Sequence, residues 1–343
     1  MKAVVKATPA YGADFLDVPE PAIKKQEVLV KVKATSICGT DVHIYDWNEW
    51  AAARIHPPLV IGHEFAGEVV EVGRDVGGLV VGDSVSGETH IPCQRCEQCR
   101  TGNYHICENV LLRGVDIQGC FAEFVALDET TAWRNDRSLP FEVASAQEPL
   151  GNAVHTVFSG GGVEGKTVAI FGCGPIGIAS AGVCRMSGAE KIFAVDISDY
   201  RLKMAQEFGA TYTINAKESD PVKEIMLETN RRGVDVFLEM AGTAETIHQG
   251  LAVLRSGGRA SLLGLPSKPV EIDFSNDIVP KMVSLNGVYG RRMFETWYTV
   301  ASYLRSGKID LGKLITHRLK MSEYQKAFEL MKSGQSGKVV MTP

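Results

Sequence analysis

The sequence lacks long apolar runs, basic patches and low-complexity segments. No stretch approaches the roughly 20 apolar residues that a membrane-spanning helix needs, and the start, residues 1–6, is too polar for a secretory signal. The net charge of −5 and the absence of clustered Lys and Arg argue against a nucleic-acid partner. We therefore expect a cytoplasmic protein that binds neither membranes nor nucleic acids.

The length and composition instead suit a globular protein of two domains. The chain has 343 residues, of which 45% are hydrophobic and 22% are charged. Residues 1–152 are β-rich in character, as in the alternating run 28–33, and residues 291–343 return to this character. Residues 153–290 alternate strand-like and helical stretches, which predicts βαβ units and a parallel sheet. We expect an α/β protein in which 153–290 are inserted into a domain made of 1–152 and 291–343.

Four of the eight cysteines lie close together in a polar stretch. Cys93, Cys96, Cys99 and Cys107 form the pattern C-x2-C-x2-C-x7-C. In a reducing compartment such clusters are metal ligands more often than disulfides. Four thiolates complete a tetrahedral zinc shell and leave no open position, so we expect a structural zinc here; the alternative is a set of free thiols on a loop.

A second candidate metal site lies earlier in the chain. Cys38 is followed by Gly-Thr-Asp-Val-His, and His63 and Glu64 belong to the pattern G-H-E-x-x-G-x5-G-x-x-V. A thiolate, an imidazole and a carboxylate are the ligand types of a catalytic zinc with one open position. Beside such a metal, Thr40 and His43 form a credible proton relay to solvent. Taken alone, they would be a helix cap and a surface histidine.

A glycine-rich turn marks the expected nucleotide site. The strand-like run 168–171 leads directly into Gly172-Cys-Gly174-Pro-Ile-Gly177, which opens a helix of small apolar residues. In the G-x-G-x-x-G motif the first glycine permits the tight turn, the second admits the pyrophosphate, and the third allows close helix packing. The helix N-terminus then faces the phosphate charge. The alternative is a Rossmann-like domain with a degenerate site.

The next strand carries the residue that discriminates between cofactors. It ends in Asp196, at the spacing of an acid that binds the adenine ribose and repels a 2′-phosphate, which favours NAD over NADP. Arg201 would instead favour NADP, because an arginine near this position can bind the 2′-phosphate. We expect NAD.

Taken together, these motifs resemble those of the zinc-dependent medium-chain alcohol dehydrogenase family over essentially the whole chain. Within it, the resemblance is closest to the members that oxidise L-threonine; it is carried by residues 36–45, 151–156, 294–298 and 333–339. It implies a GroES-like β-rich catalytic domain, a doubly wound Rossmann domain, one catalytic and one structural zinc per chain, and a homotetramer.

The resemblance also assigns individual residues. It implies Cys38, His63 and Glu64 as the catalytic zinc positions, Thr40 and His43 as the relay, and Glu148 as an acid at or near the metal. Several relatives carry aspartate at that last position, so either Glu64 or Glu148 would complete the zinc shell. The NAD contacts that it implies, besides the glycines, are Ile176, Asp196, Arg201, Leu263, Gly264, Leu265, Val288 and Tyr289.

The expected reaction is oxidation of the secondary hydroxyl of L-threonine to 2-amino-3-oxobutanoate with NAD as hydride acceptor. Two alternatives stay open: a polyol or diol dehydrogenase of the same family, and a non-catalytic NAD-binding scaffold. For the groups that hold the substrate carboxylate and ammonium, Trp50, Arg291 and Arg292 are the candidates.

Overall fold

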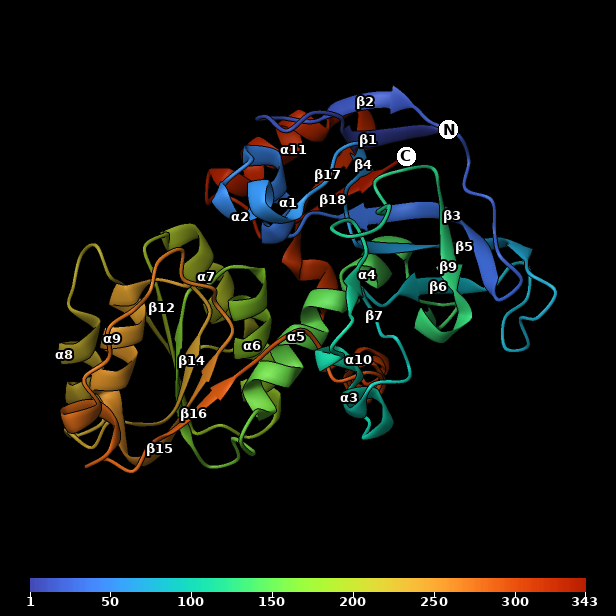
Figure 1. Cartoon of the computed structure of the whole chain (residues 1–343). Helices are drawn as coiled ribbons and strands as arrows, with labels where there is room; N and C mark the ends of the chain where they lie inside the picture. Colours follow the sequence, from blue (N-terminus) through green and yellow to red (C-terminus); the bar gives the residue numbers. More distant parts are fainter. The chain divides into compact units, whose positions relative to one another are not determined.

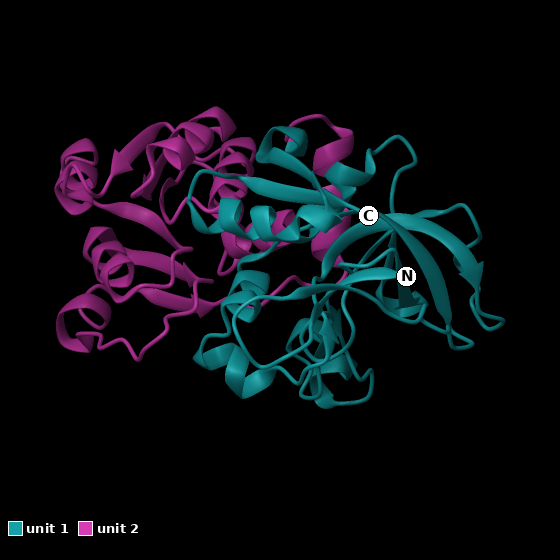
Figure 2. Cartoon of the chain, turned by 90° about the horizontal axis from the view of Figure 1, so that it is seen from above, with its two compact units in different colours: residues 1–148, 311–343 teal, residues 149–310 magenta.

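The computed structural model describes residues 1–343, which form two compact units. Residues 1–148 and 311–343 make the first unit and residues 149–310 the second (Figure 2). The sequence-based division assigns residues 149–152 and 291–310 to the first domain, whereas the structure includes both segments in the second unit. The two segments contact each other there: Arg291 packs on Gly151 and donates a hydrogen bond to Asn152 (3.1 Å).

Three sheets build the first unit (Figure 1). The largest has the strand order β10-β6-β5-β3-β18-β17, with β9 also paired to β3; a second has the order β2-β1-β4, and β7 pairs with β8. The strands are β1 (Lys2–Lys6), β2 (Asp14–Asp17), β3 (Glu27–Ser36), β4 (Leu59–Val60), β5 (Glu64–Val72), β6 (Ser84–Gly87), β7 (His90–Ile91), β8 (Leu111–Leu112), β9 (Phe124–Asp128), β10 (Ala132–Arg134), β17 (Ile315–Lys320) and β18 (Lys338–Thr342). The expected β-rich character of this part is confirmed.

Short helices close the ends of these sheets. They are α1 (Gly39–Asp46), α2 (Glu49–Arg54), α3 (Glu97–Arg100), α4 (Phe141–Ser145) and α11 (Tyr324–Lys332). The main core joins Phe65 of β5 and Phe121, which precedes β9, to Ile44 and Tyr45 of α1 and Phe328 of α11. The rings of Tyr45 and Phe328 stack with their centroids 4.3 Å apart, which fixes α1 at the end of β3.

The second unit is a doubly wound parallel sheet. Its strands are β11 (Thr167–Phe171), β12 (Lys191–Asp196), β13 (Tyr212–Asn215), β14 (Val234–Glu239), β15 (Leu254–Leu262) and β16 (Ser284–Gly287). They lie in the order β13-β12-β11-β14-β15-β16, and all neighbours are parallel. This is the 3-2-1-4-5-6 order of a dinucleotide-binding fold, so the expected Rossmann domain is confirmed.

The helices of the second unit alternate with these strands. They are α5 (Gln147–Phe158), α6 (Pro175–Met186), α7 (Asp199–Phe208), α8 (Pro221–Glu228), α9 (Ala244–Val253) and α10 (Glu295–Arg305). The strands are buried on both faces, as β11 shows with four buried residues in five. Of all the helices in the chain, none has the length and apolar character that crossing a bilayer requires.

Candidate active site

Strand register brings the proposed metal ligands together. β3 and β5 are antiparallel with Ser36 opposite Glu64, so Cys38, two residues beyond Ser36, lies beside His63, which directly precedes β5. Cys38 also starts α1: its backbone N–H donates to Asp41 Oδ2 (2.9 Å) in a capping arrangement. The spacing Cys-x-x-Asp therefore fixes the thiol at the helix start.

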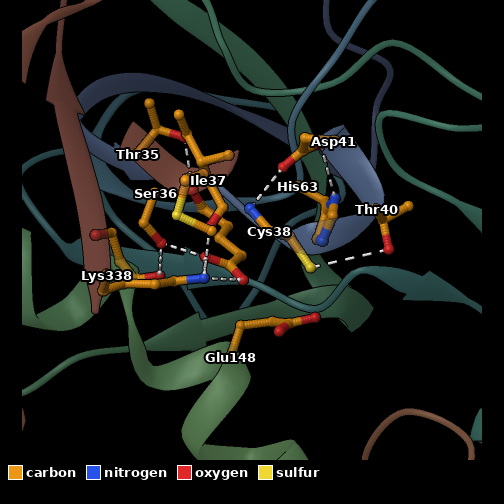
Figure 3. Close-up of polar contacts among 12 residues, drawn as sticks. Thr35, Ser36, Ile37, Cys38, Thr40, Asp41, His63, Glu148 and Lys338 are labelled. Atoms are coloured by element: carbon orange, nitrogen blue, oxygen red, sulfur yellow. Dashed lines mark hydrogen bonds and ion pairs between the residues drawn. The ribbon is translucent and has the colours of Figure 1, made fainter. Parts of the chain in front are cut away.

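The donor atoms of Cys38, His63 and Glu64 all lie within 4.8 Å of one another, and the imidazole and carboxylate are buried (Figure 3). Behind His63, Asp41 Oδ1 lies 3.5 Å from Nδ1, as a carboxylate that orients a ligating imidazole does. Burial alone would lower the pKa of His63, but the charges of Asp41 and Cys38 raise it, and the net shift is upward. Anionic groups gathered around one buried imidazole fit a cation, so these residues fit a zinc ion.

Glu64 has a second partner that the sequence did not reveal. The fully buried ammonium of Lys338 lies 2.6 Å from Glu64 Oε1 and 2.5 Å from Oε2, and Ser36 Oγ also donates to this carboxylate. Burial lowers the pKa of Lys338, but the nearby Glu64, Cys38 and Glu148 together raise it, and the net shift is upward, which favours the charged ammonium. The side chain that stands among the metal donors is thus held by a buried ion pair.

The expected relay residues lie on α1. Thr40 Oγ1 is 3.8 Å from Cys38 Sγ, and His43, one turn further on, is exposed. Asn48 Nδ2 lies 3.1 Å from His43 Nδ1; with the amide as donor, the neutral ring carries its proton on Nε2. A hydroxyl near the thiolate followed by a solvent-exposed imidazole on the same helix is suited to moving a proton outward.

Glu148 is buried in the first turn of α5 rather than exposed in a loop, with 5% of its surface accessible. Its Oε1 accepts a hydrogen bond from Thr89 Oγ1 (2.9 Å). The charge of Glu148, which Figure 3 labels, also acts on both Glu64 and Lys338. A second carboxylate therefore stands near the group of metal donors.

The four-cysteine lobe forms a closed group. The sulfurs of Cys93, Cys96, Cys99 and Cys107 all lie within 4.8 Å of one another, and Cys96 is 3.5 Å from Cys99 and 3.8 Å from Cys107. Tetrahedral zinc with Zn–S bonds of about 2.3 Å places its sulfurs about 3.8 Å apart, so the residues fit the metal. Backbone N–H groups of Arg95 and Cys96 lower the pKa of Cys93 to about 6, which favours the thiolate that a metal needs.

The glycine-rich turn has the shape that a pyrophosphate requires. Gly172 has φ +98°, and a Cβ there would lie 2.8 Å from the Ala241 backbone nitrogen. A Cβ on Gly177 would overlap the Gly172 carbonyl. Gly174 is the N-cap of α6 and has open space beside it, so the helix N-terminus is accessible to an anion.

Asp196 ends β12 directly beside this turn. Its Oδ2 accepts from Cys173 N (2.6 Å), and its Oδ1 from Ile197 N (2.8 Å) and Ser198 N (3.0 Å). A carboxylate offers about four acceptor positions, so capacity for a ribose hydroxyl remains. Arg201 follows on α7; its Nε is buried without a hydrogen-bond partner, and its charge acts on Cys173.

The other expected NAD contacts lie at the same edge of the sheet. Ile176 is on the first turn of α6, residues 263–265 follow β15, and Val288 and Tyr289 follow β16. The carboxyl ends of parallel strands form the ligand-binding edge of such sheets. A Cβ on Gly264 would overlap Glu239 and Gly242, so a close backbone approach occurs there.

The three candidates for holding the substrate charge lie in different surroundings. Trp50 is 38% exposed on α2. Arg291 is buried and bonded to Asn152, and the exposed Arg292 lies 3.7 Å from Glu295. Sequence reasoning missed Ser36, Asp41, Thr89 and Lys338, which position the site without being motif ligands. A lysine that opens the otherwise apolar run 338–341 was the available signal for Lys338.

Comparison with known proteins agrees with this geometry. Residues 24–137 match the family described as alcohol dehydrogenase GroES-like domain, and residues 175–306 match the zinc-binding dehydrogenase family. An L-threonine 3-dehydrogenase of Caldanaerobacter subterraneus subsp. tengcongensis is 53% identical over 100% of this chain and 99% of its own.

Two solved structures share the fold over the whole chain. Galactitol-1-phosphate dehydrogenase from Escherichia coli superposes with a TM-score of 0.92 at 27% identity, covering 100% of both chains. 2R,3R-butanediol dehydrogenase from Bacillus subtilis gives 0.89 at 29% identity, covering 100% of this chain and 99% of its own. With a full-length relative at 53% identity and both domain families matched, the chain belongs to the zinc-dependent medium-chain alcohol dehydrogenase family.

Proposed function

We propose that this enzyme oxidises the secondary hydroxyl of L-threonine to 2-amino-3-oxobutanoate with NAD. The observation that carries the proposal is the full-length identity of 53% with an L-threonine 3-dehydrogenase, against 29% and 27% with the butanediol and galactitol-1-phosphate enzymes. Because of this difference in identity, oxidation of a polyol or diol is the second candidate function. A non-catalytic NAD-binding scaffold is less well supported, because the donor atoms of Cys38, His63 and Glu64 all lie close together.

We assign the chemistry to the chain's own residues as follows. Cys38, His63 and Glu64 would hold the catalytic zinc, and the four-cysteine lobe a structural one. When bound, zinc supplies Lewis acidity that lowers the pKa of a substrate hydroxyl, and NAD accepts the hydride. Thr40 accepts the substrate proton as it gives its own hydroxyl proton toward His43; the ring takes up a proton on Nδ1 in place of the Asn48 hydrogen bond and releases its Nε2 proton to solvent.

Glu148 is the residue that we expect to favour an amino alcohol over a polyol as substrate. It is a buried carboxylate near the metal donors, where its negative charge favours the ammonium of an amino alcohol. A polyol carries no ammonium and would lack this charge-assisted contact in the transition state. Specificity therefore depends on the amine as well as on the alcohol.

A substrate panel tests this assignment. At saturating NAD, kcat/KM for L-threonine should exceed those for 2,3-butanediol and sorbitol by at least about 10²-fold, because only the amino alcohol pairs with Glu148. The absorbance of NADH at 340 nm follows each reaction. Glu148→Gln should reduce the ratio of kcat/KM for L-threonine to kcat/KM for the polyols. Higher efficiency with either polyol would replace the threonine proposal with the polyol one.

Cofactor choice gives a second test. Asp196→Ala should raise KM for NAD about 10-fold or more, because charge-assisted hydrogen bonds to the ribose are lost. It should also reduce the difference between KM for NAD and KM for NADP. Arg201→Ala is the matched control: it should leave KM for NAD near the wild-type value and weaken NADP use in the Asp196→Ala background. Unchanged NAD kinetics in Asp196→Ala would refute the role of this carboxylate.

The remaining parts of the proposal concern assembly and location. The family resemblance supports a homotetramer, which light scattering of the purified enzyme can check. All eight cysteines are free thiols, and the four-cysteine cluster together with Cys38 suits a reducing compartment, which supports the cytoplasm.

A further inference from the structure

A cavity in the first unit lies outside every site described above. It has a volume of about 710 Å³ and is bordered by β1, β4, β8 and β9, strands that Figure 1 shows. Much of its wall is apolar, including Val5, Leu59, Val60, Ile117 and Phe124. The volume is within the range of small-molecule sites, about 300–1,000 Å³. None of the residues assigned above to zinc, relay or NAD lines it.

One cationic side chain on this wall has almost no partner. Arg113 lines the cavity and is only 4% exposed. Its single hydrogen bond runs from Nη1 to the Gln118 carbonyl and is long, at 3.4 Å, while Nε is buried with no acceptor. A guanidinium has five N–H donors, and a buried charge without a counter-ion is costly.

Of the three carboxylates on the same wall, Glu20 is exposed, and Glu27 and Asp128 are engaged elsewhere. Glu27 accepts hydrogen bonds from the backbone N–H of Lys24 (2.8 Å) and from its ammonium (3.1 Å). Asp128 Oδ1 accepts from the backbone and hydroxyl of Thr130, at 2.9 and 2.6 Å. Neither forms an ion pair with Arg113; burial lowers the pKa of Arg113 more than their charges raise it, so the net shift is downward. The cavity therefore offers an unsatisfied cation at an apolar wall.

We propose that this cavity binds an amphipathic monocarboxylate, with its carboxylate on Arg113 and its aliphatic or aryl tail against the apolar wall. Arg113 matches a carboxylate in a bidentate geometry that a neutral ligand cannot reproduce. The apolar lining favours a ligand with an apolar tail over a small inorganic anion, because burial of the tail removes apolar surface from water. The site is separate from the zinc ligands and from the nucleotide-binding unit.

Isothermal titration calorimetry of the zinc-loaded enzyme with octanoate tests the proposal, with octanamide as the neutral analogue. Octanoate should bind at least about 10-fold more tightly than octanamide, since the charge-assisted bonds need the carboxylate. Arg113→Met should weaken octanoate at least about 10-fold and leave octanamide unchanged. Lys24→Met, which removes the other cation of the wall, is the matched control and should retain octanoate binding.

Thermal unfolding distinguishes a folded variant that has lost the binding site from a variant that does not fold. Arg113→Met should melt at or above the wild-type temperature, because an unpaired buried charge is removed, and octanoate should raise the Tm of the wild type only.

If Arg113→Met does not fold, Ala126→Phe keeps the guanidinium, fills the cavity and should abolish binding. Equal octanoate affinity in wild type and Arg113→Met, as binding at the catalytic zinc would give, refutes the proposal. Equal affinity for octanamide, or no binding to the wild type, refutes it as well.

Discussion

Replacing His63 with alanine is expected to lower kcat/KM for L-threonine by at least about 10³-fold while NAD still binds. The imidazole is one of three donors within 4.8 Å, and losing it removes a metal whose Lewis acidity contributes several kcal/mol to the transition state. The nucleotide site belongs to the other unit, 149–310, and contains no part of this donor set. Quenching of protein fluorescence by NADH should therefore give a wild-type Kd.

Zinc counting supplies the control for this prediction. Metal analysis should fall from two zinc ions per chain to one in His63→Ala, since the four-cysteine lobe is intact. Cys93→Ser is the converse variant: it should also lose one zinc, but with a lower Tm rather than a selective loss of turnover, because a closed shell leaves no position for substrate. Two zinc ions in an inactive His63→Ala would mean that His63 is no ligand.

Local patterns in the sequence were sufficient to predict these candidate ligands. Cys38 and His63 each lie at a strand end next to a turn or helix start, so residue type and short spacing suggest their role before any tertiary contact is known. The same holds for Gly172 and Asp196, because one βαβ unit contains the whole nucleotide motif. The repeated βαβ pattern also predicts the parallel direction of the strands in the second unit, but not their order.

Contacts between distant segments could not be found in this way. Lys338 and Glu64 are 274 positions apart and meet only because β18 pairs with β3, placing Val340 opposite Ser36. Arg113 is unremarkable in the sequence, and only the packing of β1, β4 and β9 shows that it lacks a counter-ion. The expected division differs from the structure at residues 149–152 and 291–310, because composition does not reveal the unit with which these two segments pack.

The buried ion pair is the basis of the second large effect. Lys338→Met should destabilise the protein by about 3–5 kcal/mol, because it leaves the Glu64 carboxylate buried without its cation. Lys338 and Glu64 have side chains that are 2% and 0% exposed, so water cannot replace the lost partner. The Ile37 carbonyl also loses the donor that Lys338 Nζ provides at 2.8 Å. Urea unfolding of the wild type and the variants, all without the catalytic zinc and with the four-cysteine lobe loaded, measures the difference.

A double-mutant cycle distinguishes loss of the pair from loss of packing. If the uncompensated charge is the cause, Lys338→Met combined with Glu64→Gln should recover most of the stability, since a neutral amide replaces the stranded carboxylate. Lys332→Met is the matched control: its partner Asp46 lies 2.6 Å away, but both side chains are about one-third exposed, so the loss should stay within about 1 kcal/mol. A double variant as unstable as Lys338→Met alone would show that the methylene packing of Lys338, and not its charge, stabilises this end of β18.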